Sequence, residues 1–285
     1  MRRLFILALI LMVSLLHSIF ALAEENEKEY AKASLNGLKI NRYAEHVSLP
    51  LEMYFNFNYG ENKTQSIFYF KPVVPFRITN NVDLIIRTIA PIYERTPTRN
   101  GQNVLGGHYI NGWGDLNPTF FITPAKFNHY VIGLGPTISI PTSTNSQYIG
   151  TGKWSIGPEL ALYYMSEDWV VGFLTDNMWS VAGDAQRPSV NTFQFQYLIS
   201  YVFDKGWYVA TNPSITANWK SPGNQQWIVP FGIGGGRTIK FYQQPLNLAM
   251  YAYYNAIRPA KVGPNWQIEL EIEWLFSPFT IRQNS

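Results

Sequence analysis

The chain has 285 residues, of which 16% are aromatic and only 14% are charged, and it contains no cysteine. Its 22 basic side chains nearly balance its 19 acidic ones, so we expect neither nucleic-acid binding nor a polybasic membrane contact. Without cysteine, no disulfide stabilises the fold.

The N-terminus has the organisation of a secretory signal peptide. A basic Met-Arg-Arg start is followed by an apolar run over residues 4–16, and Ala-Leu-Ala at residues 21–23 matches a cleavage site. Cleavage after Ala23 would leave 262 residues with 20 basic and 19 acidic side chains, because two arginines are removed. A retained anchor is the alternative, but the apolar run is short for a spanning helix. The sequence therefore predicts an exported protein.

No later stretch is apolar enough for a transmembrane helix, so any membrane crossing must use strands that close into a barrel. Residues 24–45 are charged and show no strand-like alternation. They could form a disordered periplasmic leader or fold into a barrel lumen as a plug. The sequence leaves both alternatives open.

The segment from residue 46 to residue 276 reads as a succession of β-strands with alternating apolar and polar positions. Short connections follow the even-numbered strands, and longer connections rich in Gly, Pro, Ser and Asn follow most odd-numbered ones. Outer-membrane barrels show this asymmetry, with short periplasmic turns and long extracellular loops. We predict about twelve strands, at residues 47–58, 65–76, 84–93, 114–123, 129–141, 153–165, 169–181, 190–202, 207–219, 227–239, 246–255 and 266–276.

The last predicted strand shows the alternation most clearly. Six apolar side chains share one face of residues 266–276, while Gln267 and three glutamates share the other. Its length matches the roughly 9–11 residues that a tilted strand needs to cross a bilayer. In a transmembrane barrel the apolar face contacts lipid and the polar face lines the lumen. The fold predicted is therefore an all-β, antiparallel transmembrane β-barrel.

Tryptophan placement supports the same fold. No tryptophan falls in the middle of a predicted strand, which fits two aromatic girdles at the membrane interfaces. The alternative, a secreted soluble β-sandwich, would have to bury these outward aromatic side chains elsewhere. The expected periplasmic girdle contains Trp169, Trp207 and Trp274, and the expected extracellular girdle contains Trp113, Trp154, Trp179, Trp219, Trp227 and Trp266.

Prolines inside predicted strands argue against a regular barrel, because proline cannot donate a hydrogen bond to the sheet. Two interpretations remain open: a ragged rim where pairing ends early, which we favour, or bulges that open the wall sideways for apolar molecules. The prolines concerned are Pro91, Pro118, Pro136, Pro158, Pro213 and Pro230.

Several charged residues have inward parity and are the candidate lumen-lining and selectivity residues. The glutamates of the last strand should lie near the first strand, because these two strands close the barrel. Together these charges could pack the interior as a network, or they could bias a pore toward cations. The residues are Glu52, Lys71, Arg87, Glu159, Glu269, Glu271 and Glu273.

Signals for an enzyme are weak. The sequence has no G-x-S-x-G, H-E-x-x-H or Walker motif, and the glycine run 232–236 lacks the context of a dinucleotide site. An interfacial acyl hydrolase would need a nucleophile and base, and no convincing pair is apparent for His46, His108 or His129. We predict no catalytic residues, no cofactor and no metal.

Several stretches taken together resemble the outer-membrane proteins grouped with the MetA-pathway phenol-degradation family, whose members are often described as transporters. The resemblance implies an outer-membrane barrel that takes up small aromatic or hydrophobic compounds, and it brings no catalytic residues. One departure is that residues 277–285 follow Phe276, whereas such barrels commonly end on an aromatic residue. The matching stretches are residues 48–50, 55–58, 71–76, 114–118, 133–137, 152–158, 215–219, 253–255 and 258–259.

The predicted organisation is a signal peptide (1–23), a polar leader or plug (24–45), an outer-membrane barrel (46–276) and a short tail (277–285). The expected function is passive passage of small molecules, some of them aromatic or apolar. The alternative is a closed structural or surface-interaction barrel that displays loops 94–113 and 142–152. Expected partners are outer-membrane lipid, small solutes and the outer-membrane assembly machinery.

Overall fold

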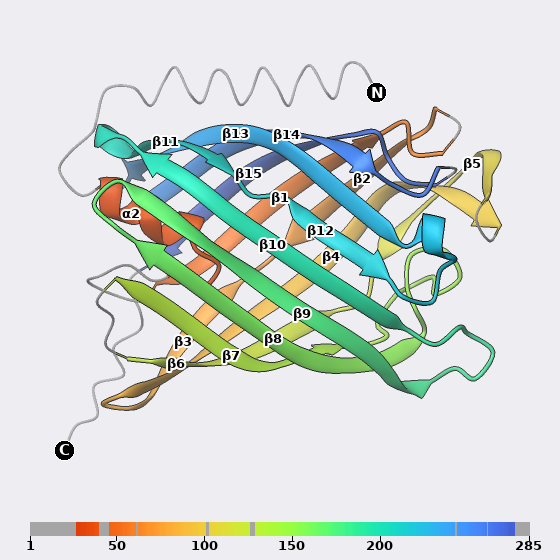
Figure 1. Cartoon of the computed structure of the whole chain (residues 1–285), viewed down its shortest axis with the longest axis horizontal. Coiled ribbons are helices and arrows are strands. Elements are labelled where there is room, and N and C mark those ends of the chain that lie inside the picture. Colours follow the sequence, from red (N-terminus) through yellow and green to blue (C-terminus); the bar gives the residue numbers. More distant parts are fainter. Residues whose placement is uncertain are drawn as a thin grey trace.

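The computed structural model describes residues 27–39, 46–60, 62–100, 103–125, 129–242, 244–260 and 262–276. These residues form a closed antiparallel β-barrel of 12 strands (Figure 1). Among the helices of these ranges, none has the length and apolarity needed to cross a bilayer. The predicted signal peptide and the C-terminal tail lie outside the described residues.

The helical segments are α2 (Glu27–Leu35), η1 (Asp204–Gly206) and η2 (Gly223–Gln225). The strands are β1 (Val47–Phe57), β2 (Thr64–Phe70), β3 (Val73–Thr79), β4 (Val82–Asn100), β5 (Asn103–Trp113), β6 (Asn117–Pro124), β7 (Tyr130–Ser139), β8 (Lys153–Met165), β9 (Trp169–Gly183), β10 (Asn191–Val202), β11 (Trp207–Thr211), β12 (Ser214–Asn218), β13 (Trp227–Phe241), β14 (Gln244–Ile257) and β15 (Trp266–Phe276).

These fifteen segments make twelve barrel strands for two reasons. A Lys71-Pro72 step separates β2 from β3, and an Asn212-Pro213 step separates β11 from β12, so each pair forms one interrupted strand. Strand β5 pairs only with the outer part of β4, and together they form a hairpin where the sequence predicted the long loop 94–113. Proline explains both interruptions, because it cannot donate to either neighbouring strand.

The first and last strands close the barrel over their full lengths, from Val47 opposite Phe276 to Phe57 opposite Trp266. Short connections between successive strands lie at one end of the barrel, here called the short-turn end. Longer connections and the β4–β5 hairpin lie at the opposite, long-loop end (Figure 1, right). Helix α2 lies at the short-turn end, where it contacts η1, β13 and β10 (Figure 1, left).

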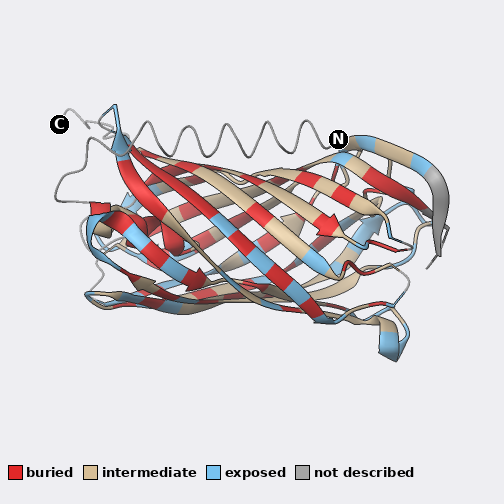
Figure 2. Ribbon diagram, turned by 90° about the horizontal axis from the view of Figure 1, so that it is seen from above, coloured by how far each residue is buried: buried red, intermediate tan, exposed pale blue. Residues whose placement is uncertain are grey.

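Buried and exposed residues alternate along the strands (Figure 2). In β8, for example, the residues at odd positions from Ser155 to Met165 are all buried, whereas the intervening residues are less buried. Large apolar side chains make up much of the outward face, as a lipid-facing wall requires. Examples are Ile122, Leu134, Ile156, Ile199, Phe231, Ile233 and Met250, all of which are exposed.

Two glycine-proline steps bring neighbouring strands unusually close. Pro136 of β7 lies opposite Pro158 of β8. A Cβ atom on Gly135 would lie 1.8 Å from the carbonyl oxygen of Phe120, and one on Gly157 would lie 1.8 Å from that of Asn177. The register skips these positions on the far side of each strand: β6–β7 pairing passes from Thr137 to Leu134, and β8–β9 pairing passes from Ile156 to Glu159.

The pairing of β11 and β12 with β13 is less continuous. It runs as far as Ala210 opposite Gly234 and resumes at Thr216 opposite Ile228. A register shift at Pro230 of β13 lies in the same region. This interruption coincides with Pro213 and Pro230, two of the prolines noted in the sequence.

Candidate functional site

The predicted acidic row lies along the seam that closes the barrel. Glu52 of β1 lies opposite Glu271 of β15, with Glu269 and Glu273 two residues to either side. Glu52 is 8% exposed, Glu269 is 5% exposed and Glu273 is fully buried. The seam therefore brings four carboxylates onto one strip of the inner wall.

Lys71 provides a positive charge beside this row. Its Nζ atom lies 2.5 Å from Glu52 Oε2. The same ammonium lies 5.1 Å from the ring centre of Tyr69 and 5.6 Å from that of Tyr54. The interruption between β2 and β3 places Lys71 at this position, where a carboxylate and two aromatic rings stabilise its charge.

A second charged cluster lies on another part of the inner wall. Arg87 of β4 forms an ion pair with Glu159 of β8, and the Thr119 hydroxyl donates to Glu159 at 2.5 Å. Asp176 of β9 lies opposite Glu159 in the strand register and is also buried. Asp176 has inward parity in the predicted strand 169–181, so the sequence contained the signal for it.

Both clusters border one cavity of about 70 Å³. This volume is roughly half that of an engineered apolar cavity that binds benzene, about 150 Å³, so the space suits a few waters or a small ion. Tyrosine and asparagine side chains also line it. The lining includes Glu52, Lys71, Arg87, Tyr208, Asn247 and Glu271.

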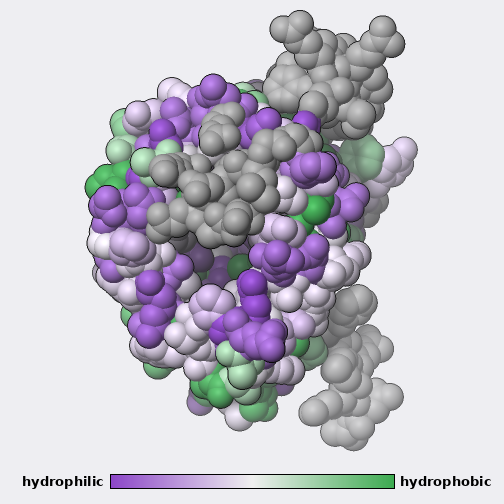
Figure 3. All heavy atoms as spheres, turned by 90° about the vertical axis from the view of Figure 1, so that its right-hand side faces the viewer, coloured by the Kyte–Doolittle hydropathy of each residue, from purple (hydrophilic) through white to green (hydrophobic). Residues whose placement is uncertain are grey.

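The wall remains polar toward the long-loop end. Asn56 donates to Gln65 at 2.9 Å, and Gln267 donates to Asn56 at 3.1 Å. Gln65 in turn donates to Thr96 at 3.3 Å. Seen from that end, hydrophilic side chains surround a central hollow (Figure 3).

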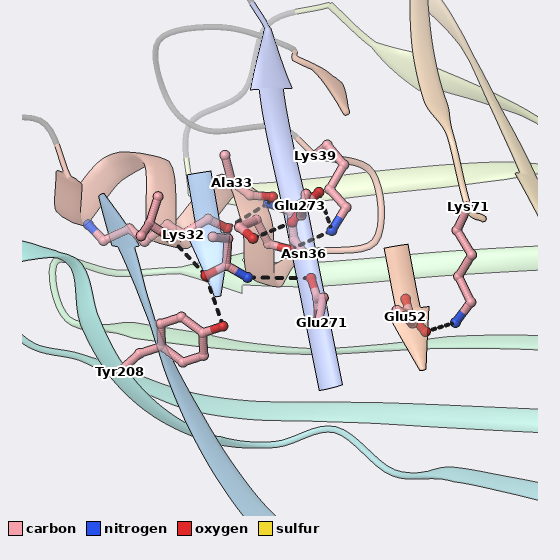
Figure 4. Close-up of polar contacts among 12 residues, drawn as sticks. Lys32, Ala33, Asn36, Lys39, Glu52, Lys71, Tyr208, Glu271 and Glu273 are labelled. Atoms are coloured by element: carbon pink, nitrogen blue, oxygen red, sulfur yellow. Dashed lines mark hydrogen bonds and ion pairs between the residues drawn. The ribbon is translucent and has the colours of Figure 1, made fainter. Parts of the chain in front are cut away.

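The N-terminal segment occupies the short-turn end of the barrel interior. Lys39 Nζ lies 2.9 Å from Glu273 Oε1, and the Ser34 hydroxyl donates to the other oxygen of Glu273 (Figure 4). Lys39 Nζ also donates to the Ser34 carbonyl oxygen at 2.5 Å. One buried carboxylate of the barrel wall thus holds two residues of this segment, residues 27–39, which we call the N-terminal plug.

Apolar contacts also hold the plug. Ala31, Leu35 and Leu38 belong to the same buried cluster as barrel residues such as Val73 and Phe121. At the outer end of α2, Lys28 Nζ lies 2.6 Å from Asp168 and 3.5 Å from Asp204. Glu27 lies 3.7 Å from Arg237 of β13.

The charges of the plug are shifted by this environment. Burial lowers the pKa of Lys39, but Glu273 and the neighbouring glutamates raise it by more, so its pKa lies above the ordinary value. The hydrogen bond to Asp168 raises the pKa of Lys28. Burial raises the pKa of Glu27, which Arg237 offsets only in part, and burial lowers the pKa of His46.

The structure brings together several of the charged side chains that the sequence placed inside the barrel. Glu52, Lys71 and the three glutamates of β15 lie together, as expected from the closure of the barrel. Arg87, which borders the cavity, pairs with Glu159, and the sequence did not predict this pairing. Their role in selectivity stays a prediction. Lys39 and Ser34 were missed, because residues 24–45 carry no alternation that could place a side chain inside the barrel.

One group of carboxylates has the geometry to hold a cation. The ligand oxygens of Glu52, Glu269 and Glu271 lie within 4.8 Å of one another. Oxygen ligands of this kind suit Mg²⁺ or Ca²⁺. Because the Lys71 ammonium already lies beside Glu52, the cluster is partly neutralised without an ion.

The tryptophans lie near the strand ends. Trp169 and Trp207 begin β9 and β11 at the short-turn end, and Trp274 lies two residues before the end of β15. At the long-loop end, Trp227 and Trp266 begin β13 and β15. Whether they form interfacial girdles stays a prediction.

No protein-family model matches the sequence, and no curated protein is detectably similar to it. Solved structures do share the fold. The COG4313 outer membrane channel from Pseudomonas putida F1 has 14% sequence identity and a TM-score of 0.60, with 81% of this chain and 95% of that chain covered. This likeness shows an outer-membrane β-barrel fold.

Two more distant structures are similar in outline. The CymD monoaromatic hydrocarbon channel has 10% identity and a TM-score of 0.45, covering 87% of this chain and 92% of that one. Outer membrane phospholipase A from Escherichia coli has 11% identity and a TM-score of 0.44, covering 89% and 99%. A shared fold does not by itself determine the activity.

Proposed function

We propose that this protein is an outer-membrane channel for small solutes, which cross through the lumen along the acidic row. The observation that carries the proposal is the charged and polar cavity inside a closed barrel. A barrel with only a structural role needs no continuous polar wall from Glu273 to Gln267. Fixed charges and hydrogen-bonding side chains along a pore are what such channels use to select solutes.

The solute class in this proposal is small aromatic compounds, as the resemblance to the phenol-degradation family implies. The cavity of about 70 Å³ is too small for such solutes while the N-terminal plug lines it, so they would cross only after the plug has moved. Tyrosines on the cavity wall, among them Tyr54, Tyr208 and Tyr251, would then offer them aromatic surface. The fold is shared with a protein described as an outer membrane channel, which is compatible with this role. Export by a signal peptide cleaved after Ala23 and insertion by the outer-membrane assembly machinery belong to the same proposal.

Conductance in planar bilayers tests the channel directly. The refolded protein from residue 24 onward and a variant that lacks residues 24–45 would be compared, each with proof of folding and insertion. Steady conductance from either supports the proposal. If neither folded, inserted protein conducts, the channel function is wrong and the closed structural barrel that displays loops 94–113 and 142–152 becomes the better account.

A lateral route for apolar solutes is a second candidate, favoured by one observation. Asn212, which lines the cavity, lies directly at the interruption between β11 and β12. Phe231 of β13, 62% exposed, lies on the outer surface at the same interruption. A bulky label on a Phe231→Cys variant should slow uptake of apolar solutes without changing ion conductance. Unchanged uptake would exclude this route.

A further inference from the structure

The charges of the plug are unusual for a permanently packed segment. Glu27, Lys32 and Lys39 are each no more than 9% exposed, and Lys28 pairs with acidic groups at the rim. Burying ion pairs costs desolvation that their attraction only partly offsets, whereas an apolar segment would fill the same space at no such cost. A segment with this composition suits a reversible contact between hydrated surfaces.

Glu273 is the barrel residue that contacts the plug within the acidic row. This carboxylate, fully buried in β15, binds both Lys39 and Ser34. Figure 4 shows Lys39 pointing from the plug toward Glu273, while Lys71 pairs with Glu52 farther along the row. Lys39 therefore reaches into the row from the plug, whereas Lys71 belongs to the wall.

Removal of the plug would change the charge of the wall. With the plug in place, the ammonium groups of Lys39 and Lys71 both lie along the row of four glutamates, at positions 52, 269, 271 and 273. Without it, Lys71 remains paired with Glu52 of that row. The Glu273 carboxylate that Lys39 and Ser34 contact would then lose both partners.

We propose that residues 27–39 are a displaceable plug that keeps the channel closed through the Lys39–Glu273 contact, and that its release creates a cation-preferring pore. The inference rests on the proposed channel function. Opening and selectivity are then coupled, because the Lys39 ammonium both holds the plug in the lumen and places a positive charge beside the acidic row.

Single-channel recording of the refolded protein tests the closed state. Lys39→Met keeps the side-chain length but removes the ammonium, so it should raise the open probability by at least about tenfold, since Glu273 is left buried without its counterion in the closed state. Lys220→Met, the same chemical change at an exposed loop position, should behave as the unaltered protein does. An open probability in Lys39→Met equal to that of Lys220→Met would contradict the proposal.

The cation selectivity of the open pore distinguishes this mechanism from a general loosening of the plug. Lys39→Met and Glu273→Gln should both open more often, because each removes one partner of the contact. The open Lys39→Met pore should prefer cations, whereas the Glu273→Gln pore should prefer them less, because one carboxylate is lost. Equal selectivity in the two variants would exclude the unmasking step.

A cleavable cross-link supplies a test that does not depend on destabilising the barrel. The chain has no cysteine, so Lys28→Cys/Asp168→Cys can be joined specifically by a disulfide-containing bismaleimide. Cross-linked protein should not open, and reductant should restore opening. If the cross-linked protein and the variant lacking residues 24–45 conduct equally, the plug does not gate the channel, although the channel function is supported. If the folded barrel lacking residues 24–45 never conducts, the proposed channel function is wrong.

Discussion

Removal of the Arg87 guanidinium should strongly destabilise the barrel. Arg87 forms an ion pair with Glu159, whose side chain is 1% exposed, so Arg87→Met would leave a buried carboxylate without its counterion. We expect a loss of about 3–5 kcal/mol in the free energy of unfolding. Denaturant titration in lipid vesicles, followed by tryptophan fluorescence, measures it.

Two controls make this measurement specific. Lys220→Met removes an exposed charge and should change stability by less than about 0.5 kcal/mol. Arg87→Met/Glu159→Gln should recover part of the loss, because the pair is coupled and the remaining group is neutral. A single Arg87→Met variant as stable as Lys220→Met would show that Glu159 finds sufficient stabilisation from Thr119.

His46 gives the plug a defined response to acid. Burial lowers its pKa below the ordinary 6.5, outweighing a hydrogen bond with the Phe276 backbone, and its ring meets Tyr30 edge-on at 5.7 Å. With the plug in place, the buried imidazole is more stable in its neutral form. The stability that neutral His46 gives the bound plug is therefore fully present above pH 6.5 and is lost as the pH falls through the lowered pKa. Hydrogen–deuterium exchange of residues 27–39, corrected for intrinsic rates, should therefore accelerate below that pH.

His46→Gln provides the comparison for this effect, because other acidic groups also titrate in the same range. The variant should lose the part of the acceleration that depends on the imidazole. If exchange in both proteins rises equally, His46 does not contribute and the carboxylates account for the response. Lys39, whose pKa is raised, keeps its contact at neutral pH and loses it only at alkaline pH, above its ordinary value of 10.5.

At the scale of elements, the contact between β6 and β7 depends on the absence of a side chain. Gly135→Ala would place a Cβ atom 1.8 Å from the Phe120 carbonyl oxygen, so one strand must move. We expect a loss of roughly 1–3 kcal/mol, or more if the strands cannot separate. Gly223→Ala, where a new Cβ meets nothing within 4 Å, is the matched control, and equal unfolding midpoints for the two would contradict this account.

The plug is also held at this scale by a small apolar surface. Leu35 and Leu38 are its large buried apolar side chains, and each contributes on the order of 1.5–3 kcal/mol when fully buried. Ordering the segment costs conformational entropy of about 1–2 kcal/mol per residue for the backbone alone. Over residues 27–39 this cost exceeds the gain from the two leucines, so the plug also depends on its polar contacts with the barrel, such as that of Lys39 with Glu273.

The sequence predicted the strands better than the plug, for physical reasons. The period-two pattern of residues 266–276 indicates both the strand and its inward glutamates, because one face must meet lipid and the other the lumen. Strands 65–76 and 207–219 were predicted as continuous, although Pro72 and Pro213 interrupt both. A proline indicates that a strand can break, but where the pairing stops depends on how both neighbouring strands are aligned with it.

Lys39 illustrates what a linear pattern cannot supply. It lies outside any strand, in a charged stretch that suits a disordered leader as well as a plug. Its contact with Glu273 joins residues 234 positions apart and exists only after the barrel closes. Period and composition describe local structure, so they predicted the acidic row but not the ammonium that binds it.

At the scale of the whole molecule, the distribution of tryptophans predicts how the barrel lies in a bilayer. The nine tryptophans fall near the two ends of the barrel, and several are strongly exposed, including Trp113 at 52% and Trp169 at 46%. Amphipathic indoles favour the level of the headgroups. Refolded protein in vesicles should therefore lose more fluorescence to lipids brominated near the headgroup than to lipids brominated near the chain ends. Strongest quenching by the deepest bromines would place the indoles at the bilayer centre and would rule out two girdles, because these strand ends could not then lie at the interfaces.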